Sequence, residues 1–229
     1  MWRIDLYRHI GTLLDSRAGT DVSFIIDGET FHAHRSVLAA RSPVFKAELL
    51  GSMAETTMSS ITLHEIAPAT FKPMLQFMYT DALPEDNELG NSPTETLQYL
   101  LVAADRYALD RLKLFCAQKL WDIVSVDTVA TNIVCAEIYS CPELKHKCID
   151  FFAEEKNFMK AALTDGLVKF VQQFPSIISE VRERIGTRHG GKHNVQHCVQ
   201  AVKHSSFKQS CVAQVFGFFV LRPCPELSL

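Results

Sequence analysis

The spacing of hydrophobic and polar positions between residues 21 and 45 predicts a β-hairpin that runs directly into two helices. An apolar run over 22–26 ends at Asp27-Gly28, which is the strongest short hairpin signal, and an alternating segment through Phe31 and Ala33 follows. The apolar positions then take a helical spacing over 35–40. Ser42-Pro43 opens a second helix over 43–50, with Ser as the cap and Pro at the first helical position, where a missing N–H costs nothing.

The segments around this hairpin predict further elements of the same small domain. Residues 5–14 read as an amphipathic helix, because Leu6, Ile10, Leu13 and Leu14 fall at i, i+4, i+7 and i+8. A short apolar stretch over 61–63 predicts a third strand added to the hairpin. Pro68 opens a helix that carries Phe71, Met74, Leu75 and Met78, and Pro73 in its early turns is a candidate bend.

Two longer apolar stripes follow a polar, acidic loop. Ser92-Pro93-Thr94-Glu95 is interpreted as a capping box. The first stripe consists of Leu97, Leu100, Leu101, Ala104 and Ala108, and the second of Leu109, Leu112, Cys116 and Leu120. Both stripes need a partner to bury them, and a small sheet surrounded by helices, an α+β architecture, meets that need.

Residues 125–185 continue the helical pattern, and the pattern stops after Ile185. Val129, Ile133 and Ala136 form one stripe, and Ser140 to Glu143 is interpreted as a second capping box. Three further sets of apolar positions follow at helical spacing: Leu144, Cys148, Phe151 and Phe152; Leu167, Phe170, Val171 and Phe174; and Ile178, Val181 and Ile185. Residues 186–229 have neither a sustained period nor a cap and are interpreted as a disordered tail, in which a short strand over 215–221 is the alternative.

Composition narrows the class of protein. The chain has 229 residues, is 47% hydrophobic and has a net charge of −3, which gives no global case for nucleic acid or an anionic membrane as partner. Its seven cysteines are an odd number without a CxxC pair, as expected for reduced thiols in an intracellular protein. There is no apolar run near the roughly 18 residues of a membrane span and no signal-peptide core. A protein of the cytoplasm and/or nucleus is expected.

Metal sites and catalysis are both disfavoured. His32 and His34 lie on the same face of the second strand, but no Cys or carboxylate stands nearby at ligand spacing, so a structural role is expected. His189, His193 and His197 follow helical spacing, although Gly190-Gly191 would weaken a helix that carried them. Cys116, Cys135 and Cys148 lie in or beside apolar stripes, where a free thiol behaves as a small hydrophobe. No catalytic triad, phosphate-binding loop or carboxylate pair is found, so neither enzymatic activity nor a cofactor is expected.

Two segments closely resemble a known family. The core FxAHRxVLAARSPVF and the later passage LLVAADRYALDRLK are similar to the BTB (POZ) domain, and in particular to the plant MATH-BTB group. The resemblance implies a BTB/POZ fold over 19–123 and a leading helix over 1–18 that belongs to its dimer interface. It also implies an α-helical BACK-like extension over 124–185, with 186–229 as a tail outside the fold.

The resemblance also implies a function in protein recruitment. BTB adaptors of ubiquitin ligases carry a hydrophobic-x-Glu motif after the second helix that contacts a cullin scaffold of the BTB-binding class. The matching residues here are Met53, Ala54 and Glu55 in SPVFKAELLGSMAETT. An apolar side chain supplies a buried anchor and a carboxylate fixes orientation. The alternative is that Met53 is an ordinary loop methionine that touches the core.

Self-association is the second expectation from the family. Such domains pair through the leading helix, which assigns Leu6, Ile10, Leu13 and Leu14 to a homodimer interface and makes full-length MATH-BTB relatives further partners. The family's substrate-capturing MATH domain has no counterpart before this helix. Two hypotheses follow: a substrate-adaptor-type subunit of a cullin-RING ubiquitin ligase, which promotes proteasomal degradation, or a non-ligase self-association module that dilutes the activity of its relatives. A transcriptional regulator ranks lower, because zinc fingers and a basic recognition helix are lacking.

Overall fold

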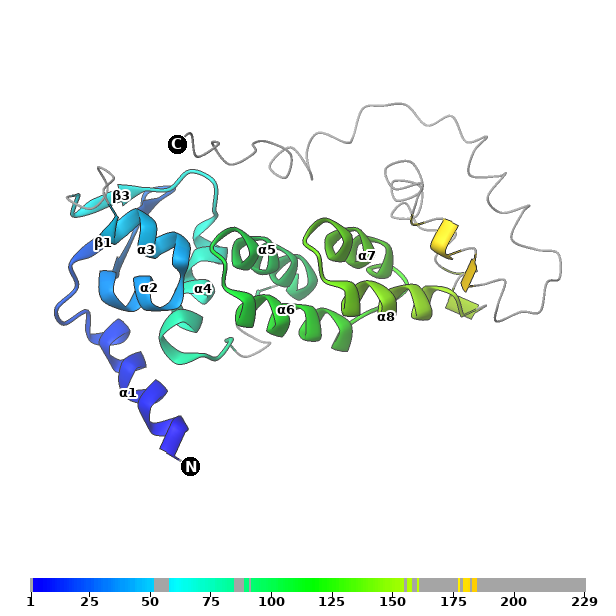
Figure 1. The fold of residues 1–229 in the computed structure, drawn as a ribbon, viewed down its shortest axis with the longest axis horizontal. Helices are drawn as coiled ribbons and strands as arrows, with labels where there is room; N and C mark the ends of the chain where they lie inside the picture. Colours follow the sequence, from blue (N-terminus) through cyan, green and yellow to red (C-terminus); the bar gives the residue numbers. More distant parts are fainter. Residues whose placement is uncertain are drawn as a thin grey trace. The chain divides into compact units, whose positions relative to one another are not determined.

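The computed structural model describes residues 2–51, 58–84, 89–90 and 92–154, together with positions 156, 157, 160, 177, 179–181, 183 and 184. All of them lie in the first of two compact units, residues 1–191, and the second unit spans 192–229. The described part is α+β, as predicted: a small sheet with helices around it, followed by further helices (Figure 1).

The sheet is built around the predicted hairpin. Strands β1 (Val22–Ile26) and β2 (Glu29–Ala33) pair antiparallel, with Val22 opposite Ala33 and Ile26 opposite Glu29. Asp27 (φ 47°) and Gly28 (φ 86°) are both in the left-handed region, as the tight turn between twisted strands requires. Strand β3 (Ser60–Thr62) pairs parallel with β1 and gives the order β2-β1-β3. The predicted third strand is therefore confirmed, beginning one residue earlier than expected.

The helices around the sheet bury an aromatic core. They are α2 (Arg35–Arg41), α3 (Pro43–Leu50), α4 (Pro68–Thr80), α5 (Pro93–Arg106) and α6 (Asp110–Asp122). Phe24 of β1 is 1% exposed, and its ring centroid lies 5.7 Å from that of Phe45 and 5.3 Å from that of Phe71. The core thus joins one strand to α3 and α4.

The leading helix is longer than predicted. Helix α1 (Trp2–Ser16) contacts α4, and a Cβ atom on Gly11 would lie 3.0 Å from Cγ2 of Thr80. Gly11 is buried, so its missing side chain is what allows the two helices to approach this closely.

The two apolar stripes are confirmed as the facing sides of α5 and α6, with one correction. Seven of the predicted apolar side chains within the two helices are buried: Leu97, Leu100, Leu101, Ala104, Leu112, Cys116 and Leu120. Leu109, which directly precedes α6, is buried as well. Ala108 was expected to continue the first stripe, but it lies beyond the end of α5 in a turn with φ 50°. The chain has already left the helical path there, so periodicity could not be extended to it.

Both predicted capping boxes are wrong, whereas the predicted Ser42 cap is confirmed. The Ser42 hydroxyl accepts a hydrogen bond from the backbone N of Phe45 at 3.1 Å. The Ser92 side chain makes no cap hydrogen bond, and the first turn of α5 is instead tied back by Thr96 Oγ1, which donates to the Leu89 carbonyl at 2.8 Å. Ser140 has φ 52° and precedes the true cap residue, Cys141, so its box is displaced by one position.

The helical extension continues through α7 (Val129–Ile138) and α8 (Pro142–Phe152), which pack against each other, and α8 also contacts α6. The predicted positions Val129, Ile133, Ala136, Leu144, Cys148 and Phe152 are buried. Ile177 and Val181 are also buried, whereas the stripe over 167–174, the tail and the candidate strand over 215–221 lie outside the described residues. Among the helices that the structure describes, none has both the length and the apolar character needed to cross a bilayer.

Candidate protein-interaction surface

The predicted cullin-contact triplet Met53-Ala54-Glu55 lies in the segment 52–57, outside the described residues. The structure describes both ends of that segment, which are the C-terminus of α3 and the approach to β3.

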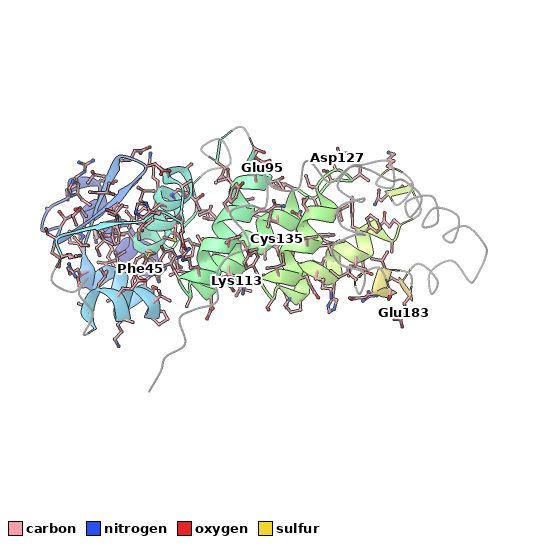
Figure 2. All side chains as sticks on the ribbon, turned by 90° about the horizontal axis from the view of Figure 1, so that it is seen from above. Phe45, Glu95, Lys113, Asp127, Cys135 and Glu183 are labelled. Carbon is pink, nitrogen blue, oxygen red and sulfur yellow. The ribbon has the colours of Figure 1, made fainter. Side chains whose placement is uncertain are left out.

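Helix α3 is fixed to the core along one face. The Ser42 hydroxyl donates to the Tyr107 carbonyl at 2.6 Å, and the Phe45 ring stacks on the Tyr107 ring with centroids 4.6 Å apart and planes 10° from parallel. Burial raises the pKa of Tyr107 to about 12, so this ring is neutral at physiological pH. The opposite face is open to solvent, and Leu50 at the end of the helix is 56% exposed. Figure 2 labels Phe45 in this region.

The backbone path at the end of α3 leaves no room for a side chain at position 51, which is a glycine. A Cβ atom at this position would lie 2.2 Å from the Ala47 carbonyl oxygen, a distance that no side chain can occupy. The Gly51 N–H donates to that same carbonyl at 3.1 Å. The residue identity at 51 therefore allows the chain to turn out of the helix directly before the segment that carries the triplet.

The other end of the segment is fixed to the sheet. The Ser59 carbonyl accepts from the Ser23 backbone N at 2.9 Å and from the Ser23 hydroxyl at 3.1 Å. Met58, one residue earlier, is 50% exposed. Two exposed apolar side chains, Leu50 and Met58, thus flank the triplet on anchored backbone.

One arginine joins the two ends. The Arg35 guanidinium donates from Nη1 to the Leu49 carbonyl at 3.0 Å and from Nη2 to the Met58 carbonyl. Arg35 is itself held at the residue that precedes β1, because its backbone N donates to Asp21 Oδ1 at 2.8 Å and its Nε lies 3.5 Å from the Asp21 carbonyl oxygen. Sequence reasoning did not single out Arg35, since its partners lie 14 to 23 residues away and no periodicity marks them.

His34 has the structural role expected for it. The Tyr79 hydroxyl lies 2.8 Å from the His34 backbone N, which donates to it, and 2.8 Å from ring Nδ1. Nε2 lies 2.8 Å from the Ala18 carbonyl oxygen. Both ring nitrogens are thus used within the fold, and His34 links the end of α1 to α4. Burial raises the pKa of Tyr79.

The residues predicted for the dimer interface are only partly described. The helix that carries them is confirmed as α1. Leu13 is 39% exposed, Ile10 and Leu14 are half-buried, and the Leu6 side chain lies outside the described part. A partly open apolar face on α1 is compatible with pairing, and pairing stays a prediction.

The thiols of α6, α7 and α8 are buried. Cys116, Cys135 and Cys148 are free and lie inside the packed helices, where Cys135 is labelled in Figure 2. Burial raises the pKa of Cys135 and of Cys148 to about 12, and it raises the pKa of Cys116 as well. A neutral, buried thiol is a poor nucleophile and metal ligand. In the part of the chain that is described, no group of three His, Cys, Asp or Glu is arranged to hold a metal, and His189, His193 and His197 lie outside it.

Comparisons with known proteins place these elements in a family context. Residues 10–123 match the family model of the BTB/POZ domain, and residues 128–182 match that of the BPM/SPOP BACK domain. The chain is 39% identical over 174 residues, which are 74% of this chain and 43% of the relative, to "BTB/POZ and MATH domain-containing protein 3" of Arabidopsis thaliana. It is also 39% identical over 190 residues, 79% of this chain and 40% of the relative, to "BTB/POZ and MATH domain-containing protein 4" of the same plant.

The matches cover part of each relative. The chain spans less than half the length of these relatives, 43% and 40%. Among solved structures, the "BTB domain of zebrafish PATZ1" aligns with a TM-score of 0.41 and 22% identity, over 52% of this chain and 90% of that one.

Proposed function

This chain belongs to the BTB/POZ family and carries a BACK domain of the BPM/SPOP type, and from that premise we propose that it is an adaptor-type subunit of a cullin-RING ubiquitin ligase. It binds the cullin through its BTB domain, associates with itself and with MATH-BTB relatives, and acts in the cytoplasm and/or nucleus. The ubiquitin transfer belongs to other subunits of the ligase, and this chain contributes binding surfaces alone.

One observation carries the proposal. The segment with Met53, Ala54 and Glu55 leaves α3 at a required glycine and returns at Met58, with backbone anchored to the core on both sides. Leu50 and Met58 expose apolar surface at its two ends, being 56% and 50% exposed. Two exposed apolar side chains that flank a sequence with a further methionine and a carboxylate have the composition expected of an interface anchor and its orienting charge.

The cullin contact is tested by titrating the purified chain with a cullin N-terminal domain of the BTB-binding class. Met53→Asp should weaken binding by more than about 2 kcal/mol, as loss of a buried anchor does. Glu55→Ala should cost less, because a partly solvated carboxylate mainly affects orientation and association rate.

Two control variants test whether a change of surface charge elsewhere affects the cullin affinity as much as a change in the triplet does. Ile138→Asp places a new carboxylate at an exposed apolar residue of α7 (45% exposed), and Glu29→Ala removes a carboxylate at the hairpin. Both should leave the cullin affinity unchanged. Wild-type affinity in Met53→Asp would exclude the triplet as the contact. No binding of the wild type at tens of micromolar would favour the alternative, a non-ligase self-association module.

Self-association is tested separately by light scattering at micromolar protein. We expect a dimer mass, and Leu13→Asp should shift the mass toward the monomer, because Leu13 is a partly exposed residue on the open face of α1. A monomer mass for the wild type would remove this part of the proposal without affecting the cullin titration.

A further inference from the structure

The Arg35 side chain donates hydrogen bonds to the backbone on both sides of the segment 52–57. We propose that Arg35 is a positioning residue of the partner-binding surface: it joins the end of α3 to the entry of β3 and so holds the exposed side chains Leu50 and Met58 in one relative arrangement. The identity of the partner as a cullin rests on the proposed function above, whereas the closing of the connection does not.

The bridge joins two particular backbone carbonyls. The Leu49 carbonyl is one of the last four of α3, which have no partner within the helix. The Met58 carbonyl precedes β3. One planar guanidinium donates to both, so the end of the helix and the entry to the strand are held at a fixed separation by two charge-assisted hydrogen bonds.

The guanidinium is itself supported from a third element. Asp21 accepts from the Arg35 backbone N through its carboxylate and lies beside Nε through its carbonyl. Asp21 is in turn joined to β2, because its N–H donates to the Ala33 carbonyl at 3.2 Å. The Arg35 bridge is therefore attached, through Asp21, to the β1–β2 hairpin, which belongs to the buried core of the domain.

Only arginine has the donor geometry that this position uses. The guanidinium presents five N–H donors in a rigid fork, whereas lysine offers a compact ammonium on a flexible stem. A lysine at 35 keeps the charge and can reach one of the two carbonyls, but it cannot span both while also lying against Asp21. Arg35→Lys is therefore a conservative change that removes the bridge.

Joining the two ends matters for binding because Leu50 and Met58 have to keep one relative position when a partner docks against both. Tying the two ends together in the free protein reduces the conformational freedom that binding would otherwise remove, which is a preorganisation effect. Loss of the bridge should therefore weaken partner binding while the triplet itself is unchanged.

Hydrogen exchange on the full chain tests the bridge without any partner. In Arg35→Lys, peptides that cover residues 50–59 should exchange about 10-fold faster, while peptides from α5 stay within about 2-fold of the wild type. Arg106→Lys is the matched control, since Arg106 pairs with Glu65 on the surface, at side-chain exposures of 50% and 59%, and should change neither region.

Titration with the cullin N-terminal domain then tests the consequence. Arg35→Lys should bind about 5- to 20-fold more weakly than the wild type, and Arg106→Lys should bind equally well. If the wild type does not bind the cullin, the proposed function fails, and the exchange experiment still decides whether Arg35 closes the connection.

Several results would overturn the inference. Unchanged exchange over 50–59 would show that the bridge does not hold the connection, and equally faster exchange in all peptides would make Arg35 a residue of general stability. Faster local exchange with an unchanged cullin affinity would remove the positioning role. Failure of both Arg35→Lys and Arg35→Gln to fold would also overturn it, because Arg35 would then belong to the core.

Discussion

The α2–α3 pair and the α7–α8 pair are both two-helix units with a short connection, and different interactions hold them. In the first pair, polar side chains fix the backbone: Ser42 caps α3 and reaches the Tyr107 carbonyl, and Asp21 accepts from the first N–H of α2. In the second pair the cap residues Thr128 and Cys141 make no cap hydrogen bond with their side chains, and buried apolar faces hold the helices together.

The two kinds of interaction have different structural consequences. Directional hydrogen bonds set the position of backbone atoms, so the α2–α3 pair is suited to present the connection to β3 from a defined base. Apolar burial is non-directional and grows with the area removed from water, so the α7–α8 pair adds stability without fixing a site. Two polar contacts add to the apolar burial of the second pair: Lys145 Nζ of α8 lies 2.9 Å from Glu137 Oε2 of α7, and Asn132 Oδ1 accepts from Gln98 Nε2 of α5 at 2.8 Å.

The largest expected effect compares the aromatic anchors of the two pairs. Phe45 is 0% exposed and Phe152 is 1% exposed, and truncation of either to alanine should lower the free energy of unfolding by about 3–5 kcal/mol. Urea denaturation followed by circular dichroism measures both. A single transition that shifts in both variants would show that the two pairs unfold together, whereas a second transition in Phe152→Ala alone would show that the extension unfolds independently.

The second prediction concerns the polar anchor of the first pair. Ser42→Ala should cost about 2 kcal/mol, because it removes a helix cap and leaves the buried Tyr107 carbonyl without this donor. Ser92→Ala is the matched control: Ser92 also precedes a proline at a helix start but makes no cap hydrogen bond, so its change should cost less than about 0.5 kcal/mol. Equal losses in the denaturation midpoint would contradict the distinction between the two serines.

A third prediction concerns an ion-pair cluster between the first pair and α6. Asp81 is 6% exposed at its side chain and accepts from Arg41 Nη2 and Arg111 Nε, each at 2.6 Å. Asp81→Asn should cost about 1–2 kcal/mol, because it weakens two charge-assisted hydrogen bonds while asparagine still tolerates the left-handed backbone at φ 57°.

Glu65→Gln is the comparison for Asp81, since its pair with Arg106 is exposed and should contribute less than about 0.5 kcal/mol. Thermal unfolding at low and high salt measures both variants. A loss in Glu65→Gln as large as that in Asp81→Asn would contradict the role given to burial.

The smallest expected effect is a pH dependence to which the two thiols of the second pair, Cys135 and Cys148, contribute. The pKa of Cys135 and of Cys148 rises from 9.0 to about 12 on folding, because burial disfavours the thiolate. Between these values the unfolded chain releases protons that the folded protein keeps, so the free energy of unfolding falls as pH rises above about 9, by about 1 kcal/mol per thiol at pH 10.

Urea denaturation at pH 7.5 and pH 10 measures this dependence. Cys148→Ala should be less stable at both pH values but should lose less stability between them, since one of the titrating groups is gone. An unchanged pH slope in this variant would show that Cys148 does not contribute to the alkaline loss.

Local patterns in the sequence determined much of this protein. The Asp27-Gly28 turn, the Ser42 cap and the apolar stripes of α5 to α8 depend on residues within a few positions of one another, where steric preference and periodicity act directly. The same local reasoning failed at Ala108, Ser92 and Ser140, where the chain leaves regular geometry and the surrounding fold sets the backbone.

Only the tertiary structure decided the features that hold the candidate surface. The parallel pairing of β3 with β1, the use of both His34 ring nitrogens and the bridge from Arg35 to Leu49 and Met58 join residues that are distant in the chain. A hydrogen bond depends on distance and angle between two groups, and no spacing in the sequence encodes the meeting of a side chain with a carbonyl 23 residues away. The sequence determined which elements form, and the packing of those elements determined which atoms meet.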